Sequence, residues 1–145
     1  MKEEKSKKTK IIIGVIAGIS FGVFYFLGQQ FFAPDIGTEL KNAAIKLNKE
    51  TPIQVDEYTR LDSASSKGIT NFSYYYTLIN LDKSEVSLKS VNENFKPGLI
   101  ENVKTSPDLK IYRDNKITME YIYFDKNGEF VINIAVTPEI YNEID

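Results

Sequence analysis

The chain carries few side chains of the kinds that usually perform catalysis. Its 145 residues include no histidine and no cysteine, which removes the commonest general base, the commonest metal ligand and all thiolate chemistry. Ser65, Ser66 and Lys67 supply the residue types of a serine–lysine hydrolase, but neighbouring residues do not converge on one reacting atom. A glycosidase-like carboxylate pair would need a cleft, for which this short chain leaves little room. The residue types therefore predict no enzyme, no metal and no cofactor.

A polar group of residues surrounds Tyr58. Asp56 and Arg60 are four residues apart, so in an extended strand they share a face with Tyr58 between them. Such a group could form a polar site. The interpretation that we favour is a solvated strand face with a surface ion pair worth about 0–1 kcal/mol.

The nine tyrosines also allow a ligand-binding interpretation. Tyr74, Tyr76, Tyr121 and Tyr123 recur at every second position of β-rich segments, together with apolar residues. Buried tyrosine packs like phenylalanine and satisfies its hydroxyl at the edge of a core. We therefore expect these four side chains to fill the core.

Charge is distributed unevenly along the chain. Residues 1–33 contain five lysines and two glutamates, a net charge of +3, and the whole chain has a net charge of −2. The remainder therefore carries −2 − 3 = −5. An acidic domain repels phosphate backbones, so we expect no nucleic-acid partner.

The first 33 residues have the pattern of a membrane anchor. A basic tail (1–10) precedes an apolar segment (11–33) that is long enough to cross a bilayer. Lysines before the span predict a cytoplasmic N-terminus, with a linker (34–37) and an extracytoplasmic domain (38–145) on the far side. The alternative is a cleaved signal peptide, but cutting after Ala33 would place Phe31 where a small residue is required. We therefore expect a single-pass protein of the inner, or cytoplasmic, membrane.

Gly14, Gly18 and Gly22 repeat at four-residue spacing within this segment. That spacing places all three on one helix face, where small residues let two helices approach closely. Homo-oligomerisation or packing against a partner helix would follow. The alternative is that glycine is simply frequent in membrane spans.

Hydrophobic periodicity predicts the elements of the outer domain. A helix from Thr38 to Asn48 is followed by a strand from Ile53 to Ser63, a loop from Ser63 to Gly68 and a strand from Ile69 to Leu81. A second helix follows, and two last strands surround Asn127–Gly128, which favours a two-residue type I′ turn. That loop pairs Tyr123 with Ile132 and Tyr121 with Ile134.

The second helix is predicted from Ser84 to Val103, with a kink or break at Pro97. Short connections and hairpins favour an antiparallel sheet with helices on one face. The predicted fold is therefore α+β, with a small four-stranded antiparallel sheet and the element order α-β-β-α-β-β.

Alternation along the strands leaves a mixed outer face. Tyrosine and arginine are typical of protein interfaces, and exposed apolar patches mark partner sites. The candidate partner-binding residues are Tyr58, Arg60, Tyr75, Ile122, Phe124 and Val131. The alternative is that a helix covers this face too and makes it a second core.

Several segments resemble an uncharacterised family of small bacterial envelope proteins, membrane-anchored or exported, with an α-β-β-α-β-β domain. They are Leu47–Pro52, Val55–Ser63, Tyr74–Leu78 and Tyr121–Gly128. Many members of that family have a cysteine pair, one late in the second helix and one near the C-terminus, whereas this chain has neither cysteine. The resemblance implies an envelope location and supplies no activity.

These observations lead to one functional hypothesis and one alternative. The hypothesis is a non-enzymatic, membrane-anchored interaction protein of the bacterial envelope, in an assembly, secretion-accessory or immunity role. The alternative is a small-ligand-binding or sensor domain on the same anchor.

Overall fold

The computed structural model describes residues 35–144. The predicted tail, membrane helix and glycine face lie outside the described residues, and within residues 35–144 no helix is both long and apolar enough to cross a membrane. The elements are α2 (Ile36–Glu50), β1 (Ile53–Gln54), β2 (Thr59–Lys67), β3 (Asn71–Leu78), the 3₁₀ turn η1 (Lys83–Glu85), α3 (Leu88–Ser90), the π-helical turn η2 (Val91–Phe95), α4 (Lys96–Thr105), the 3₁₀ turn η3 (Pro107–Leu109), α5 (Lys110–Asp114), β4 (Thr118–Phe124), β5 (Phe130–Val136) and α6 (Pro138–Tyr141).

The α+β class is confirmed, but the four-stranded antiparallel sheet is wrong. The sheet has five strands in the order β1-β2-β3-β4-β5, and it is mixed because β3 and β4 run parallel. The segment between these two strands contains α3, α4 and α5, and such a helical crossover returns the chain to start the next strand in the same direction. The sheet therefore joins a three-stranded antiparallel unit, β1 to β3, to the β4–β5 hairpin through one parallel pair.

The first predicted strand is split into two. Asp56 Oδ1 accepts hydrogen bonds from the backbone N–H of Tyr58 (2.7 Å) and of Thr59 (3.0 Å), which makes a tight turn between β1 and β2. Ile53 then pairs with Leu61. The serine-rich segment predicted as a loop is the second half of β2, and the chain reverses only after Lys67.

The helix α2 begins earlier than predicted. Its N-cap is Asp35 rather than Thr38, because the Asp35 carboxylate accepts a hydrogen bond from the Thr38 N–H at 2.8 Å. Near its end, the Asn48 side chain bonds both the N–H and the C=O of Ala64, at 2.7 and 2.8 Å. Asn48 thus supplies hydrogen-bond partners to the backbone of β2 where the two-residue strand β1 no longer pairs with it.

The helix predicted to kink or break at Pro97 is continuous but irregular. It begins at Leu88 behind the N-cap Ser87, and a π-helical turn from Val91 to Phe95 precedes the proline. The Lys96 N–H bonds Val91 O, five residues back. Proline has no N–H to donate and clashes with the preceding turn, and a widened turn accommodates it without ending the helix.

Gly98 is the next residue in α4 and offers a direct stability test. A Cβ placed there meets nothing within 4 Å. Because glycine in a helix costs roughly 0.5–1 kcal/mol relative to alanine, Gly98→Ala should raise the free energy of unfolding by about that amount. Urea unfolding followed by circular dichroism would measure it, and a destabilised variant would contradict the helical geometry at this position.

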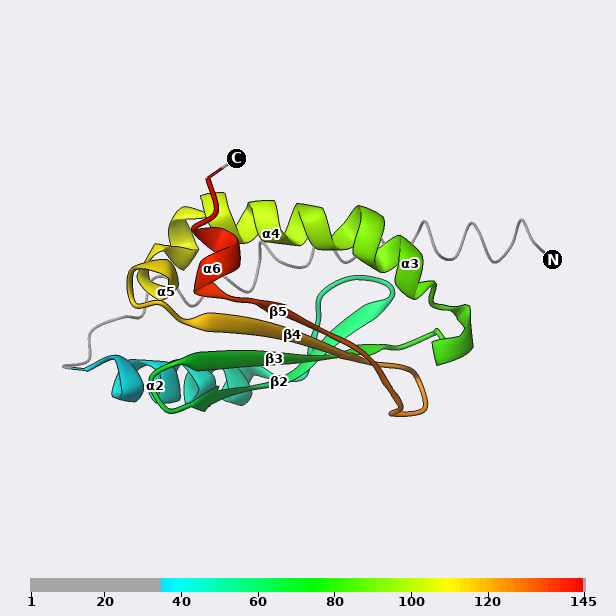
Figure 1. Ribbon diagram of the computed structural model, residues 1–145. Helices are drawn as coiled ribbons and strands as arrows, with labels where there is room; N and C mark the ends of the chain where they lie inside the picture. Colours follow the sequence, from blue (N-terminus) through cyan, green and yellow to red (C-terminus); the bar gives the residue numbers. More distant parts are fainter. Residues whose placement is uncertain (1–34, 145) are drawn as a thin grey trace.

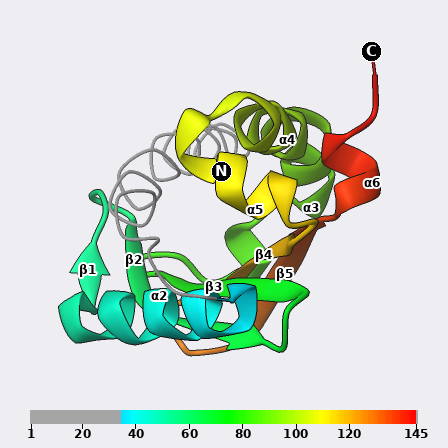
Figure 2. The same cartoon turned by 90° about the vertical axis from the view of Figure 1, so that its left-hand side faces the viewer.

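All helices within residues 35–144 pack on one face of the sheet, and their buried side chains join its inner side in one core. α2 lies along β2, whereas α3 to α6 lie toward β4 and β5 (Figures 1 and 2). The Tyr112 ring on α5 lies edge to face against Phe72 on β3 at 5.6 Å, and Phe95 lies against Tyr123 on β4 at 6.3 Å. Buried residues of α2 and α4 belong to the same core cluster, so both groups of helices cover the same face. The face opposite has none of the described helices over it.

Aromatic rows fill the inner side of the sheet. The four predicted core tyrosines are buried, which confirms their placement. Because β3 and β4 pair in register, Tyr74 stacks on Tyr121 at 5.4 Å between ring centroids, and Tyr76 stacks on Tyr123 at 4.9 Å. Tyrosines alternate along both strands, and the parallel pairing therefore places them side by side as two stacked pairs across β3 and β4.

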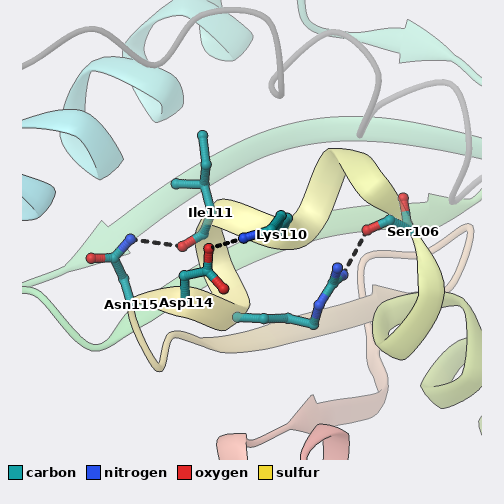
Figure 3. Close-up of polar contacts among 6 residues, drawn as sticks. Ser106, Lys110, Ile111, Asp114 and Asn115 are labelled. Carbon is teal, nitrogen blue, oxygen red and sulfur yellow. Dashed lines mark hydrogen bonds and ion pairs between the residues drawn. The ribbon is translucent and has the colours of Figure 1, made fainter.

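The short helix α5 is held by local polar contacts, some of which Figure 3 shows. Lys110 pairs with Asp114 at 2.6 Å, and the Asn115 amide donates to Ile111 O at 2.8 Å. The Arg113 guanidinium donates to Val103 O and Ser106 O, at 2.8 and 2.6 Å, which caps the C-terminal end of α4. These contacts place the turn before β4 beside the β2–β3 turn, where Thr118 N–H bonds Thr70 O at 2.7 Å.

Candidate partner-binding face of the sheet

The outer face of the sheet is assembled from alternate residues of four strands. Strand pairing places them in three rows, which are Arg60–Thr77–Phe124–Phe130, Ser63–Tyr75–Ile122–Asn133 and Ser65–Ser73–Glu120–Ala135. Most of these side chains are half-buried by their neighbours in the sheet. The face is therefore a surface of fixed backbone geometry rather than a set of loops.

An apolar patch crosses this face, and we call it the outer strip: Tyr75, Ile122, Phe124 and Phe130. Tyr75, Ile122 and Phe124 are half-buried, and Phe130 is 49% exposed. The Phe124 and Phe130 rings meet edge to face with centroids 6.2 Å apart. Contiguous exposed apolar side chains on a rigid sheet are typical of protein interaction sites.

Polar side chains border the outer strip on both sides. Arg60 Nε pairs with Asp62 Oδ1 at 2.5 Å, and Thr77 Oγ1 donates to the other Asp62 oxygen. On the opposite border, Ser73 Oγ donates to Glu120 Oε2 at 2.8 Å. An apolar centre with a hydrogen-bonded polar rim is the usual anatomy of a protein interface. The Arg60–Asp62 pair is partly exposed, so its own stabilising contribution is only about 0–1 kcal/mol.

The predicted site residues do not all reach this face. Arg60, Tyr75, Ile122 and Phe124 lie on it, and their role in partner binding stays a prediction. Tyr58 lies in the turn before β2, where its carbonyl accepts from Ile79 N–H at 2.9 Å, so it is outside the strand rows.

Val131 was predicted to lie on the outer face, and this prediction is wrong. It is 4% exposed and belongs to the core. The β4–β5 register shifts between Tyr123, paired with Ile132, and Phe124, paired with Phe130, so Val131 is the extra residue of a bulge. The bulge turns Val131 toward the core and brings Phe130 opposite Phe124 on the outer face. Strict alternation therefore selected the wrong neighbour.

The hairpin loop explains this shift. The two-residue type I′ turn is wrong, because Asp125 N–H bonds Glu129 O at 2.8 Å and leaves three residues between the ends of the loop. Gly128 has φ 80°, and Gly128 N–H bonds Asp125 O at 3.0 Å, as in a type I turn followed by a glycine bulge. The longer loop and the bulge at Val131 offset each other, so the predicted pairs Tyr123–Ile132 and Tyr121–Ile134 are confirmed.

The other polar residues singled out in the sequence have structural partners. Asp56 forms the β1–β2 turn, and Arg60 pairs with Asp62 instead of Asp56. Burial raises the pKa of Asp56, although the backbone donors Tyr58 and Thr59 oppose the rise. Ser65 bonds the Tyr75 hydroxyl at 3.1 Å on the outer face. No catalytic arrangement emerges from these contacts.

Sequence reasoning missed two members of the outer face. Phe130 and Ser63 are both brought there by register shifts, at Val131 in β5 and between Leu61 and Ser63 in β2, whereas alternation already places Asp62 on the same side as Arg60. The one available signal was that Phe130 adjoins a turn and is apolar. No residue type announces a bulge in either strand.

The fold and its open face define a small α+β domain with a five-stranded mixed sheet covered on one side. Residues 37–132 match the family described as a domain of unknown function, DUF8479, and the chain belongs to that family. Comparison with curated protein sequences finds no match of comparable significance.

Three solved structures share the fold. The type II secretion system pilotin AspS from Vibrio cholerae is 15% identical with a TM-score of 0.53, over 72% of this chain and 91% of AspS. The type 2 secretion system pilotin EpsS from Vibrio vulnificus is 13% identical with a TM-score of 0.59, over 75% and 94%. A protein from Pseudomonas aeruginosa described as secreted is 14% identical with a TM-score of 0.58, over 77% and 100%. At these identities the likeness shows the fold alone.

Proposed function

We propose that this chain is a non-enzymatic envelope protein with a secretion-accessory or assembly role, which binds a protein partner through the outer strip. The observation that carries the proposal is the fold shared with two secretion-system pilotins. A third protein of this fold is described as secreted, which supports an extracytoplasmic location for the domain.

The N-terminal sequence supplies the other half of the proposal. Residues 11–33 would hold the protein in the cytoplasmic membrane as a single span, with the basic tail inside. The face formed by Gly14, Gly18 and Gly22 would pack against a second copy or against a partner helix. The domain would then act close to the outer surface of that membrane.

The chemistry of the outer strip favours a protein partner. Phe124 and Phe130 offer aromatic area on a rigid backbone, and Arg60 and Tyr75 are of the types that dominate binding energy at interfaces. The hydrogen-bonded rim keeps its polar groups satisfied when water is displaced. A partner would therefore place an apolar side chain over Phe130 at the centre of its contact.

Site-specific crosslinking would test this proposal. The chain has no cysteine, so Phe130→Cys creates a single attachment point for a photocrosslinker in the full-length protein. Leu88→Cys is a matched control, because Leu88 is 47% exposed at the start of α3. In native membranes we expect one discrete adduct from position 130 and none of the same mass from position 88.

A charge substitution at the same position measures the strength of the contact. Phe130→Asp should weaken the captured complex about 30-fold or more, which corresponds to the roughly 2 kcal/mol of a hot-spot aromatic. Leu88→Asp should leave it unchanged, and both variants should keep the circular dichroism of the parent. Equal capture by the two folded variants would refute docking at the outer strip.

A further inference from the structure

The end of the molecule where α2 begins also carries an exposed apolar turn. The β2–β3 turn (Gly68–Thr70) lies against the first turn of α2, where a Cβ added to Gly37 would lie 3.1 Å from Ile69 Cγ2. Ile69 is nevertheless 61% exposed. Figure 1 shows the start of α2, this turn and α5 at the same left-hand end of the domain.

Two lysines lie in the segments that adjoin Ile69. Lys67 ends β2, and Lys116 lies in the turn before β4, which is joined to the β2–β3 turn by the bond from Thr118 N–H to Thr70 O. Both lysines are exposed, and neither forms an ion pair with a residue that the structure describes. The nearby Asp35 carboxylate is engaged, since its two oxygens accept from Thr38 N–H and Thr38 Oγ1, each at 2.8 Å.

The segment that precedes α2 indicates what lies next to this end of the domain. The predicted membrane span reaches Ala33, and α2 begins at Ile36. Three residues of extended chain cover at most about 10 Å, and the polar interface of a bilayer is itself several ångströms thick. The start of α2, and with it Ile69, therefore lies at the membrane surface wherever the anchor is inserted.

We propose that the β2–β3 turn is a second membrane contact of this protein. Ile69 enters the lipid interface beside the anchor, and Lys67 and Lys116 lie toward anionic headgroups. The proposal rests on the membrane anchor of the proposed function. The turn carries an exposed isoleucine with flanking lysines, and the predicted span ends three residues before the adjoining helix. This combination of side chains and position favours contact with a bilayer surface over exposure to water.

This contact would orient the domain. β3 and β4 run in parallel away from the turn, from the pair Asn71–Thr118 to the pair Thr77–Phe124. Six residue steps along a strand cover about 20 Å. Phe124 and Phe130 would then stand at the far end, up to that distance from the bilayer, where a partner could reach them.

The chain contains no tryptophan, so a single introduced indole reports its surroundings without background. The full-length Ile69→Trp variant would be reconstituted in vesicles of phosphatidylcholine and phosphatidylglycerol, with and without brominated acyl chains. Its emission should shift to the blue and be quenched severalfold more strongly by brominated lipid than that of Leu88→Trp. Leu88 begins α3, the helix at the opposite end of the domain in Figure 1.

The outcomes separate this proposal from the proposed function. If the chain resists alkaline extraction from the vesicles but Ile69→Trp matches Leu88→Trp in colour and quenching, the anchor holds and the second contact is refuted. If the chain is extracted, both the anchor and this contact are refuted. Loss of crosslinking at position 130 with normal quenching at position 69 would refute partner docking and leave the membrane contact standing.

Discussion

Raising the pH by about one unit above 10 should unfold the domain cooperatively. Burial raises the pKa of Tyr74, Tyr76, Tyr112, Tyr121 and Tyr123 above the usual value of 10. Their hydroxyls stay protonated in the folded state, whereas those of the unfolded chain ionise near pH 10. The folded state therefore binds more protons, and stability that is complete below pH 10 is lost as the pH rises.

The size of the effect follows from linkage. Each tyrosine lowers the free energy of unfolding by about 1.4 kcal/mol per pH unit above 10, so five give about 7 kcal/mol per unit. The whole free energy of unfolding of a small domain is about 5–15 kcal/mol. Tyrosinate absorbance and far-ultraviolet circular dichroism should consequently change together, in one steep transition.

Tyr76→Phe is the matched control for this titration, because it removes one buried hydroxyl and keeps the ring that stacks on Tyr123. The alkaline slope of the unfolding free energy should become shallower by about 1.4 kcal/mol per pH unit. Lysine deprotonation is common to both proteins and cancels in the comparison. A titration in which the tyrosines ionise one by one without loss of structure would contradict the stacked core.

Asp125→Ala should be the most damaging single substitution outside the apolar core. The Asp125 carboxylate is fully buried and accepts from three backbone N–H groups, those of Lys83 at 2.9 Å, Asn127 at 2.8 Å and Glu129 at 2.9 Å. It thus ties the β4–β5 hairpin to the segment after β3. Alanine leaves these donors without their acceptor, and we expect the midpoint of thermal unfolding to fall by about 10 °C.

The acid response of this variant provides the check. Desolvation by itself would raise the pKa of Asp125, but the hydrogen bonds from Glu129, Lys83 and Asn127 outweigh it and hold the pKa below the usual value. The stabilisation that Asp125 contributes is present above the ordinary carboxyl pKa near 4 and is lost as the pH falls through the lower folded value. Wild-type protein should lose more stability on acidification than Asp125→Ala. Asp125→Asn keeps an acceptor oxygen but cannot titrate, so its stability at neutral pH should lie between the two while its acid profile matches that of Asp125→Ala. Identical acid profiles for wild-type protein and Asp125→Ala would contradict this role.

Alternation in the sequence was sufficient to assign the two faces of β3 and β4. Tyr74, Tyr76, Tyr121 and Tyr123 were placed in the core because every second residue of a strand shares a face, and burial of one face needs no knowledge of neighbours. The same parity placed Tyr75, Ile122 and Phe124 outside. A family resemblance was also visible in these segments, and residues 37–132 match one family model, that of DUF8479.

Tertiary structure alone decided the pairing of strands and the exceptions to alternation. Whether β4 runs parallel to β3 depends on where the helical crossover returns, which no local pattern encodes. The fate of Val131 and Phe130 depended on a bulge that compensates a three-residue loop, and a single extra residue reverses the faces of those that follow. The sequence by itself therefore determined which face of a regular strand each residue takes, because alternation is a local property of the backbone. Long-range packing decided which of these residues meet on the outer strip.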